Sequence, residues 1–176
     1  MPPNEILAIR HGEFIGNEYV DPPLSEFGIN EIKRAANVIF DHCEKFQLTA
    51  RIVCSPSART IQTAQIIASV FPDLNPEIIN DLSDSTQDKI VKESIQQLIR
   101  ETDHSLLVVV THARHVPYIP EYANRQIRFM DTESLYDYMS NVPFGSGFLS
   151  PATGRSLPTE PTKVVLFFDA SNPQLP

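Results

Sequence analysis

The apolar residues of this chain follow two different patterns. Short continuous apolar runs bounded by polar or turn-forming residues indicate buried strands, whereas apolar residues spaced three and four positions apart indicate helices that cover a sheet. The continuous runs predict strands at 6–9, 51–54, 77–79, 106–110 and 163–168. The helical spacing predicts helices at about 25–46, 57–71 and 90–101, and a mostly helical segment at 116–138.

Strands and helices alternate along the chain, which is typical of an α/β protein with a mainly parallel sheet. The run 106–110 is apolar throughout, as expected for a central strand buried on both faces, and 163–168 is expected at a sheet edge. Residues 141–162 are rich in Pro, Gly and Ser and are predicted to form a long surface loop. We therefore predict one domain over residues 1–176, folded as a three-layer α/β/α sandwich.

Length and charge narrow the possible partners. A chain of 176 residues can bury a core without disulfides, and Cys43 and Cys54 are expected to be buried thiols, too few for a metal cluster. The net charge of -8 argues against binding to nucleic acid or to an anionic membrane, so a bound anion must be held by a local group of cations. The apolar runs are too short to cross a bilayer, and we expect a cytoplasmic protein.

Cationic and imidazole side chains follow three of the predicted strands. Arg10 and His11 come directly after the first run, Arg59 lies at the start of the helix after the second, and His112 comes directly after the run 106–110. Parallel strands end side by side, so these residues can converge on one pocket. Two arginines, two histidines and the amide groups of a helix start suit a tetrahedral dianion. Any one of these residues taken alone would be interpreted only as a polar residue that follows a strand.

Four segments, in this order, resemble the histidine phosphatase superfamily, also called the phosphoglycerate mutase-like family, in its smaller branch 1. The resemblance ends near residue 116, and the chain after about residue 120 matches nothing in the family pattern. The matching segments are Arg10-His11-Gly12-Glu13, Asp21-Pro22-Pro23-Leu24-Ser25-Glu26-Phe27-Gly28 (family pattern D-x-P-L-T-x-x-G), Ser55-Pro56-Ser57-Ala58-Arg59 with Gln62-Thr63-Ala64 (S-P-x-x-R-x-x-Q-T-A), and Val108-Val109-Val110-Thr111-His112.

This resemblance implies a phosphoglycerate mutase-like fold and a metal-independent phosphatase without a cofactor. His11 would be the nucleophile and would form a phosphohistidine that water resolves. Arg10, Arg59 and a protonated His112 would hold the phosphoryl oxygens, and Asn17 would add a neutral donor. The expected partner is a phosphorylated small molecule or a phosphoprotein. Phosphoryl transfer needs a positioned nucleophile and fixed positive charge, and arginines can supply that charge.

The resemblance also implies a proton donor for the leaving group, usually a glutamate in the turn after the third strand. This turn offers aspartates instead, and we assign the role to Asp84, with Asp81 or no residue as the alternatives. An aspartate that donates a proton at pH 7 needs burial or a neighbouring carboxylate. Without a donor, the enzyme would favour a leaving group that departs easily, such as the imidazole of a protein phosphohistidine, and small members resembling bacterial phosphohistidine phosphatases fit this option.

Other functions use the same residues. A phosphoglycerate mutase-type phosphotransferase needs a closed pocket, and the short spacing between Arg59 and His112 leaves little room for the segments that build one. A catalytically weak or inactive member would bind a phosphorylated ligand without turnover. A metallohydrolase could use His11 and His112 as ligands, but neighbouring arginines disfavour a cation. The physiological substrate, the oligomeric state and the role of residues 120–162 are not predicted.

Two further expectations concern residues near the histidines. Glu13 could orient the ring of His11. Arg114 and His115 are read as ordinary residues at a helix start, and the alternative places them at the pocket rim, where they would bind the body of the substrate.

Overall fold

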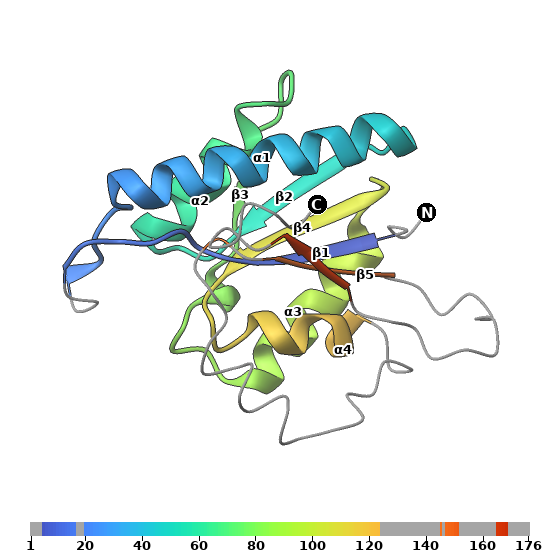
Figure 1. Ribbon diagram of the computed structural model, residues 1–176. Coiled ribbons are helices and arrows are strands. Elements are labelled where there is room, and N and C mark those ends of the chain that lie inside the picture. Colours follow the sequence, from blue (N-terminus) through green and yellow to red (C-terminus); the bar gives the residue numbers. More distant parts are fainter. Residues whose placement is uncertain (1–4, 17–19, 124–144, 146, 152–164, 169–176) are drawn as a thin grey trace.

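A computed structural model describes residues 5–16, 20–123, 145, 147–151 and 165–168 (Figure 1). The helices and strands lie close to the segments expected from the apolar pattern. In chain order they are β1 (Glu5–Arg10), α1 (Glu26–Phe46), β2 (Ala50–Cys54), α2 (Ala58–Ala68), β3 (Glu77–Ile78), the 3-10 helix η2 (Asn80–Leu82), α3 (Asp88–Glu101), β4 (Leu106–Thr111), the 3-10 helix η3 (Val116–Tyr118), α4 (Ile119–Ala123), β5 (Gly147–Pro151) and β6 (Val165–Phe168).

The described strands form a six-stranded sheet in the order β3-β2-β4-β1-β5-β6. The pairs β1–β4, β4–β2 and β2–β3 are parallel, whereas β5 runs antiparallel to β1 and β6 antiparallel to β5. The mainly parallel sheet predicted from the sequence is therefore confirmed, with β4 at its centre and β6 at its edge. Arg10 pairs with Thr111 and Cys54 with Val110, so β1, β2 and β4 end at nearly the same level.

Two layers of helices cover the sheet, α1 and α2 on one face and α3 and α4 on the other (Figure 1). Successive side chains of a strand point to opposite faces, and every residue of β4 is buried. Leu7 of β1 and Val108 of β4 belong to the apolar core under α1 and α2, whereas Ala8 and Val109 belong to the core under α3. This arrangement is the predicted three-layer α/β/α sandwich.

The C-terminal part differs from the prediction at one point. Residues 141–162 were expected to form a surface loop, but Gly147–Pro151 is strand β5 and pairs antiparallel with β1. This segment has a glycine and a proline at its ends and only two large apolar residues, so its strand conformation depends on hydrogen bonds to β1. Of the predicted helical segment 116–138, the described part is η3 and the short α4. The rest lies outside the described residues.

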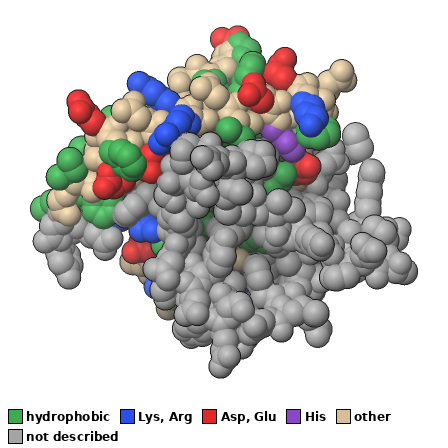
Figure 2. Space-filling model, in the orientation of Figure 1, with side chains coloured by type: hydrophobic (Ala, Val, Ile, Leu, Met, Phe, Trp, Pro, Cys, Tyr) green, Lys and Arg blue, Asp and Glu red, His purple; other side chains and the backbone are tan. Residues whose placement is uncertain are grey.

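Cys43 and Cys54 are free and buried, so the prediction of buried thiols is confirmed. No helix in the described part of the chain is long and apolar enough to cross a membrane. On the face shown in Figure 2, acidic and basic side chains lie among one another over the described surface around α1. Of the two arginines expected to bind phosphate, Arg59 is buried, with only 6% of its surface exposed, and Arg10 is partly buried.

Candidate active site

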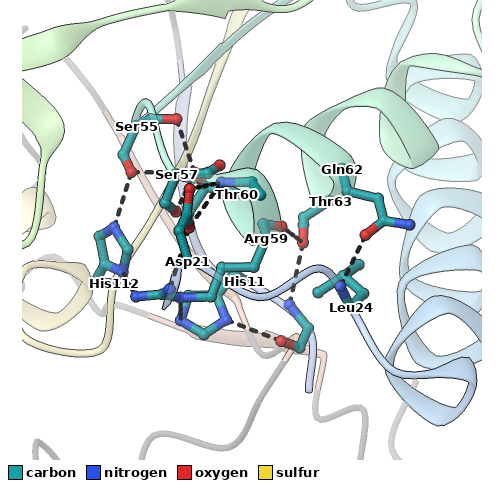
Figure 3. Close-up of polar contacts among 12 residues, drawn as sticks. His11, Asp21, Leu24, Ser55, Ser57, Arg59, Thr60, Gln62, Thr63 and His112 are labelled. Carbon is teal, nitrogen blue, oxygen red and sulfur yellow. Dashed lines mark hydrogen bonds and ion pairs between the residues drawn. The ribbon is translucent and has the colours of Figure 1, made fainter. Parts of the chain in front are cut away.

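Strand pairing brings three distant segments together at the carboxyl-terminal ends of β1, β2 and β4. The N–H of His11 donates to the carbonyl of Thr111 (3.1 Å), and the N–H of Ser55 donates to the carbonyl of Val110 (3.1 Å). The pairing of β1 and β2 with β4 therefore continues past the strand ends. His11, Ser55 and His112 follow these three strands and lie together at the start of α2 (Figure 3).

Arg59 lies between the two histidines. It is in the first turn of α2, its Nε donates to Nε2 of His11 (3.2 Å), and its Nη2 lies 3.4 Å from Nδ1 of His112. The two imidazole centroids are 5.3 Å apart, with the rings edge to face. All three side chains are buried. The structure thus brings together His11, Arg59 and His112, as the positions at the strand ends indicated.

The hydrogen bonds of His11 define its tautomer. Its Nδ1 lies 2.9 Å from the carbonyl oxygen of Gly12, which can only accept, so Nδ1 carries the proton. Nε2 consequently presents a lone pair, which accepts the N–H of Arg59. Burial lowers the pKa of His11 to about 3, and the positive charges of Arg59 and Arg10 act in the same direction. His11 is therefore neutral at pH 7 and has an unprotonated nitrogen at the centre of the site.

Glu13 does not orient this ring, contrary to the expectation from the sequence. Its carboxylate accepts from the hydroxyl of Ser25 (2.7 Å), and the backbone carbonyl of Gly12 holds the ring of His11 instead. Every residue has a backbone carbonyl, so the sequence does not indicate that the carbonyl of Gly12 holds this ring.

His112 is also neutral in this arrangement. Arg59 can only donate, so Nδ1 of His112 is an acceptor and its Nε2–H donates to the hydroxyl of Ser55 (2.8 Å). Burial lowers the pKa of His112 to about 4, with Arg59 acting in the same direction and Asp84 in the opposite one. At pH 7 the protonated His112 implied by the family resemblance is thus not the form that these contacts favour. A dianion beside the ring would raise its pKa.

Arg10 and Asn17 complete the set of residues expected to bind phosphate. Arg10 is the last residue of β1, and it lies close enough to His11 for its charge to lower the pKa of that imidazole. Asn17 lies outside the described residues. Within the described part of the chain, no group of three or more His, Cys, Asp and Glu side chains is placed to hold a metal ion.

The turn with the candidate proton donor is fastened to the segment after His112. The hydroxyl of Thr111 donates to the carbonyl of Leu82 (3.0 Å), and Nε2 of the buried His115 donates to the carbonyl of Ser83 (3.1 Å). These bonds place Asp84 near enough to His112 for its charge to raise the pKa of that ring. Asp84 itself is exposed.

The neighbouring Arg114 also contacts this turn. Its guanidinium lies 3.2 Å from the carboxylate of Asp88 and 3.5 Å from the carbonyl of Asp84. Arg114 and His115 therefore hold the turn in place, a structural role close to the first of the two readings from the sequence. Asp81, the alternative donor, is exposed as well.

Several residues of the matching segments support the site without touching its centre. The hydroxyl of Thr63 accepts the N–H of Gly12 (3.1 Å) and donates to the carbonyl of Arg59 (2.8 Å), so it joins the loop after β1 to α2. The side chain of Gln62 accepts the N–H of Leu24 (2.8 Å) in the loop before α1. Gln62 and Thr63 therefore have a structural role, because they join two loops to α2. Their residue types alone do not predict this role.

Three contributors to the site were not singled out from the sequence. Phe14 places its ring 5.1 Å from the guanidinium carbon of Arg59, within cation–π distance. The hydroxyl of Ser55 accepts a hydrogen bond from Nε2–H of His112, and the carboxylate of Asp21 accepts one from the N–H of Ala58. The available signal was position, because all three lie inside or directly beside the four matching segments.

A family model described as the histidine phosphatase superfamily (branch 1) matches residues 6–100. This match covers more than half of the chain and includes His11 and Arg59, whose placement together at the strand ends has just been described. The protein therefore belongs to the histidine phosphatase superfamily. A search of curated protein sequences found no match.

Solved structures with the same fold include phosphatases and a mutase. The protein histidine phosphatase SixA complexed with tungstate is 18% identical, with a TM-score of 0.60, covering 83% of this chain and 86% of that one. Phosphoglycerate mutase from Plasmodium falciparum is 17% identical, with a TM-score of 0.61 and coverages of 98% and 93%. Phosphoserine phosphatase from Entamoeba histolytica is 16% identical, with a TM-score of 0.56 and coverages of 83% and 89%. At these identities the similarity establishes the phosphoglycerate mutase-like fold.

Proposed function

We propose that this protein is a metal-independent phosphatase that hydrolyses a phosphomonoester or a protein phosphohistidine through a phosphohistidine intermediate on His11. One observation carries the proposal. Nε2 of the buried His11 keeps its lone pair because Gly12 holds the proton on Nδ1, and this lone pair faces Arg59, with the ring of His112 packed beside that of His11. A neutral imidazole nitrogen beside fixed positive charge is what attack on a phosphate requires.

In the first step Nε2 of His11 attacks phosphorus, an N–P bond forms, and the bond from phosphorus to the leaving group breaks. The ring gains positive charge as it bonds phosphorus, and the carbonyl of Gly12 stabilises that charge through Nδ1–H. Substrate must first displace the hydrogen bond from Nε of Arg59, after which the guanidinium binds phosphoryl oxygens.

Arg10 and His112 supply the remaining charge in this proposal, and Asn17 a neutral donor. His112 takes up a proton as the dianion binds, because a dianion raises the pKa that burial lowers to about 4. In the second step a water oxygen attacks phosphorus, the N–P bond breaks, and its electron pair returns to Nε2 of His11. Arginines provide the charge neutralisation that metal ions give to other phosphoryl-transfer enzymes.

Asp84 is the proposed proton donor to the leaving group, and its carboxylate later accepts the proton of the attacking water. Its position near His112 supports this role. Its exposure favours substrates whose leaving group needs little protonation, such as a phosphohistidine or an aryl phosphate. We therefore propose that turnover is fastest for this class of substrate.

The direct test is hydrolysis of p-nitrophenyl phosphate by the wild type and by His11→Ala. We expect activity that survives EDTA and is inhibited by vanadate, and a loss of at least about 10³-fold in kcat for His11→Ala, because no other group replaces the nucleophile. His104→Ala is the matched control, since this histidine lies before β4, at the opposite end of that strand from His112.

Three outcomes would contradict the proposal. Activity that disappears with EDTA and returns with a divalent cation would indicate a metallohydrolase. Retained activity in His11→Ala would exclude His11 as the nucleophile. Binding of orthophosphate without turnover of any phosphoester or phosphohistidine protein would indicate a phospholigand-binding protein.

A further inference from the structure

Asp21 belongs to one of the four matching segments, yet the proposed mechanism gives it no role. Both oxygens of its carboxylate accept the N–H of Ala58, at 3.0 and 2.9 Å, and one of them lies 3.5 Å from Nη1 of Arg59 (Figure 3). Ser57, the N-cap residue of α2, forms no side-chain cap bond. Asp21 therefore caps α2 from a distant loop and brings a negative charge to the guanidinium at the centre of the site.

The backbone at Asp21 supports a specific placement of this carboxylate. Its φ of 47° lies in the left-handed region, which residues other than glycine, asparagine and aspartate rarely adopt. The left-handed conformation turns the loop so that the carboxylate reaches α2 and Arg59. Its side chain remains 52% exposed while that of Arg59 is 7% exposed, so Asp21 lies between solvent and the buried guanidinium.

We propose that Asp21 is an internal anion that competes with phosphate for Arg59 and thereby limits the affinity of the site for orthophosphate. This inference rests on the proposed function, in which Arg59 binds the phosphoryl oxygens. A carboxylate 3.5 Å from the guanidinium offsets part of the charge that attracts a dianion. Weaker binding of orthophosphate should allow the enzyme to release the phosphate product faster after each turnover.

The size of this effect follows from the surroundings of Asp21. A half-exposed carboxylate is screened by water, so its repulsion of a bound dianion corresponds to about a three- to tenfold change in affinity. Asp21 also raises the pKa of His112, so its removal should lower that pKa further. The charged and titratable groups that act on His112 are Arg59, His115, Asp84 and Asp21, and the ring of His11 packs against it.

The decisive variant is Asp21→Asn. Asparagine tolerates the left-handed conformation, and its amide oxygen can still accept the N–H of Ala58, so the variant removes the charge and keeps the cap. Calorimetric titration with orthophosphate and with vanadate should give Kd values three- to tenfold lower than in the wild type. In the same variant, NMR titration of the imidazoles should show His112 protonating at lower pH, an effect that a purely structural role of Asp21 would not produce.

Two further variants complete the test. Asp21→Gly also removes the charge and tolerates the left-handed conformation, so it should tighten orthophosphate binding as well and covers a folding defect in the asparagine variant. Glu101→Gln is the control for net charge, because Glu101 ends α3, just before the start of β4 and away from the site, and its Kd should equal that of the wild type.

The outcomes separate this inference from the proposed function. If the wild type binds phosphate and vanadate but both Asp21 variants bind them equally well or more weakly, the inference is overturned and the proposed function stands. If the wild type binds neither oxyanion, the proposed function fails and the inference fails with it.

Discussion

At the scale of single residues, the site depends on which nitrogen of each imidazole carries the proton. A backbone carbonyl fixes the proton of His11 on Nδ1, and the donor Arg59 at Nδ1 of His112 leaves the proton of that ring on Nε2, where it is donated to the hydroxyl of Ser55. The remaining nitrogen of each ring faces Arg59. Two acceptors around one permanent donor keep both histidines neutral, and this arrangement leaves His11 ready to act as a nucleophile at neutral pH.

At the same scale, the proposed role of Asp84 as proton donor predicts that its importance depends on the leaving group. We predict that Asp84→Asn lowers kcat/KM, which reports the step that expels the leaving group, by about 10²-fold for an alkyl phosphate such as β-glycerol phosphate and by less than about fivefold for p-nitrophenyl phosphate. An alkoxide must be protonated as it leaves, whereas p-nitrophenolate departs unaided. Steady-state kinetics with both substrates checks this difference.

Asp81→Asn is the control for this experiment, since Asp81 is exposed in the same turn. Equal losses with both substrates in Asp84→Asn would show that Asp84 has another role. A selective loss of alkyl phosphate hydrolysis in Asp81→Asn would move the proton donor to that residue.

At the scale of elements, the loop after β1 is packed tightly against α1. A Cβ on Gly12 would lie 2.8 Å from Cγ1 of Ile32, and a Cβ on Gly28 would overlap the backbone of Glu13. These two glycines therefore bring the loop that follows His11 against the start of α1. The hydroxyl of Thr63 fastens the same loop to α2, so both helices of this face hold the nucleophile in place.

This packing predicts the effect of Gly28→Ala. The added methyl group must displace the backbone of Glu13, which should lower the free energy of unfolding by about 1–3 kcal/mol. It should also reduce kcat/KM, because His11 lies two residues before Glu13 in the displaced loop. Urea unfolding and phosphatase assays measure the two effects. Asn30→Ala is the control, as Asn30 is exposed on the same helix, and equal stability of the two variants would contradict this account of the loop.

At the scale of the whole molecule, two features could be predicted from the sequence: the strands that contain apolar runs, and the convergence of residues that follow strand ends. The strands β1, β2 and β4 each contain a short apolar run, and the rule that parallel strands end side by side indicated that His11, Arg59 and His112 converge. Strand β5 was missed because its conformation depends on pairing with β1.

The contacts of Asp21 and of the Gly12 carbonyl were missed for a related physical reason. They depend on where loops pass in space, and the type of a residue does not determine that path. The role of Asn17 remains a prediction, because this residue lies outside the described part of the chain.

Stability against acid is a property of the whole molecule that follows from the site. The pKa of His11 is lowered to about 3 and that of His112 to about 4, whereas both histidines of the unfolded chain take up protons below about pH 6.5. The unfolded state binds more protons in this range, so the free energy of unfolding should fall between pH 6.5 and 4, by about 1 kcal/mol per pH unit for each ring.

Urea unfolding at pH 7.0, 6.0 and 5.0 tests this prediction. His112→Asn should reduce the slope of stability against pH, whereas Asn30→Ala, which replaces an exposed side chain without a titratable group, should leave it unchanged. Equal slopes in the wild type and His112→Asn would show that the burial of this imidazole has no energetic consequence.

The central claim is that His11 carries the phosphoryl group during turnover. The most direct measurement is to quench the enzyme in alkali during turnover of p-nitrophenyl phosphate and to locate the acid-labile phosphate by mass spectrometry of its peptides. The account predicts phosphate on Nε2 of His11 in the wild type and none in His11→Asn. Phosphate on another residue, or full turnover in His11→Asn, would contradict it.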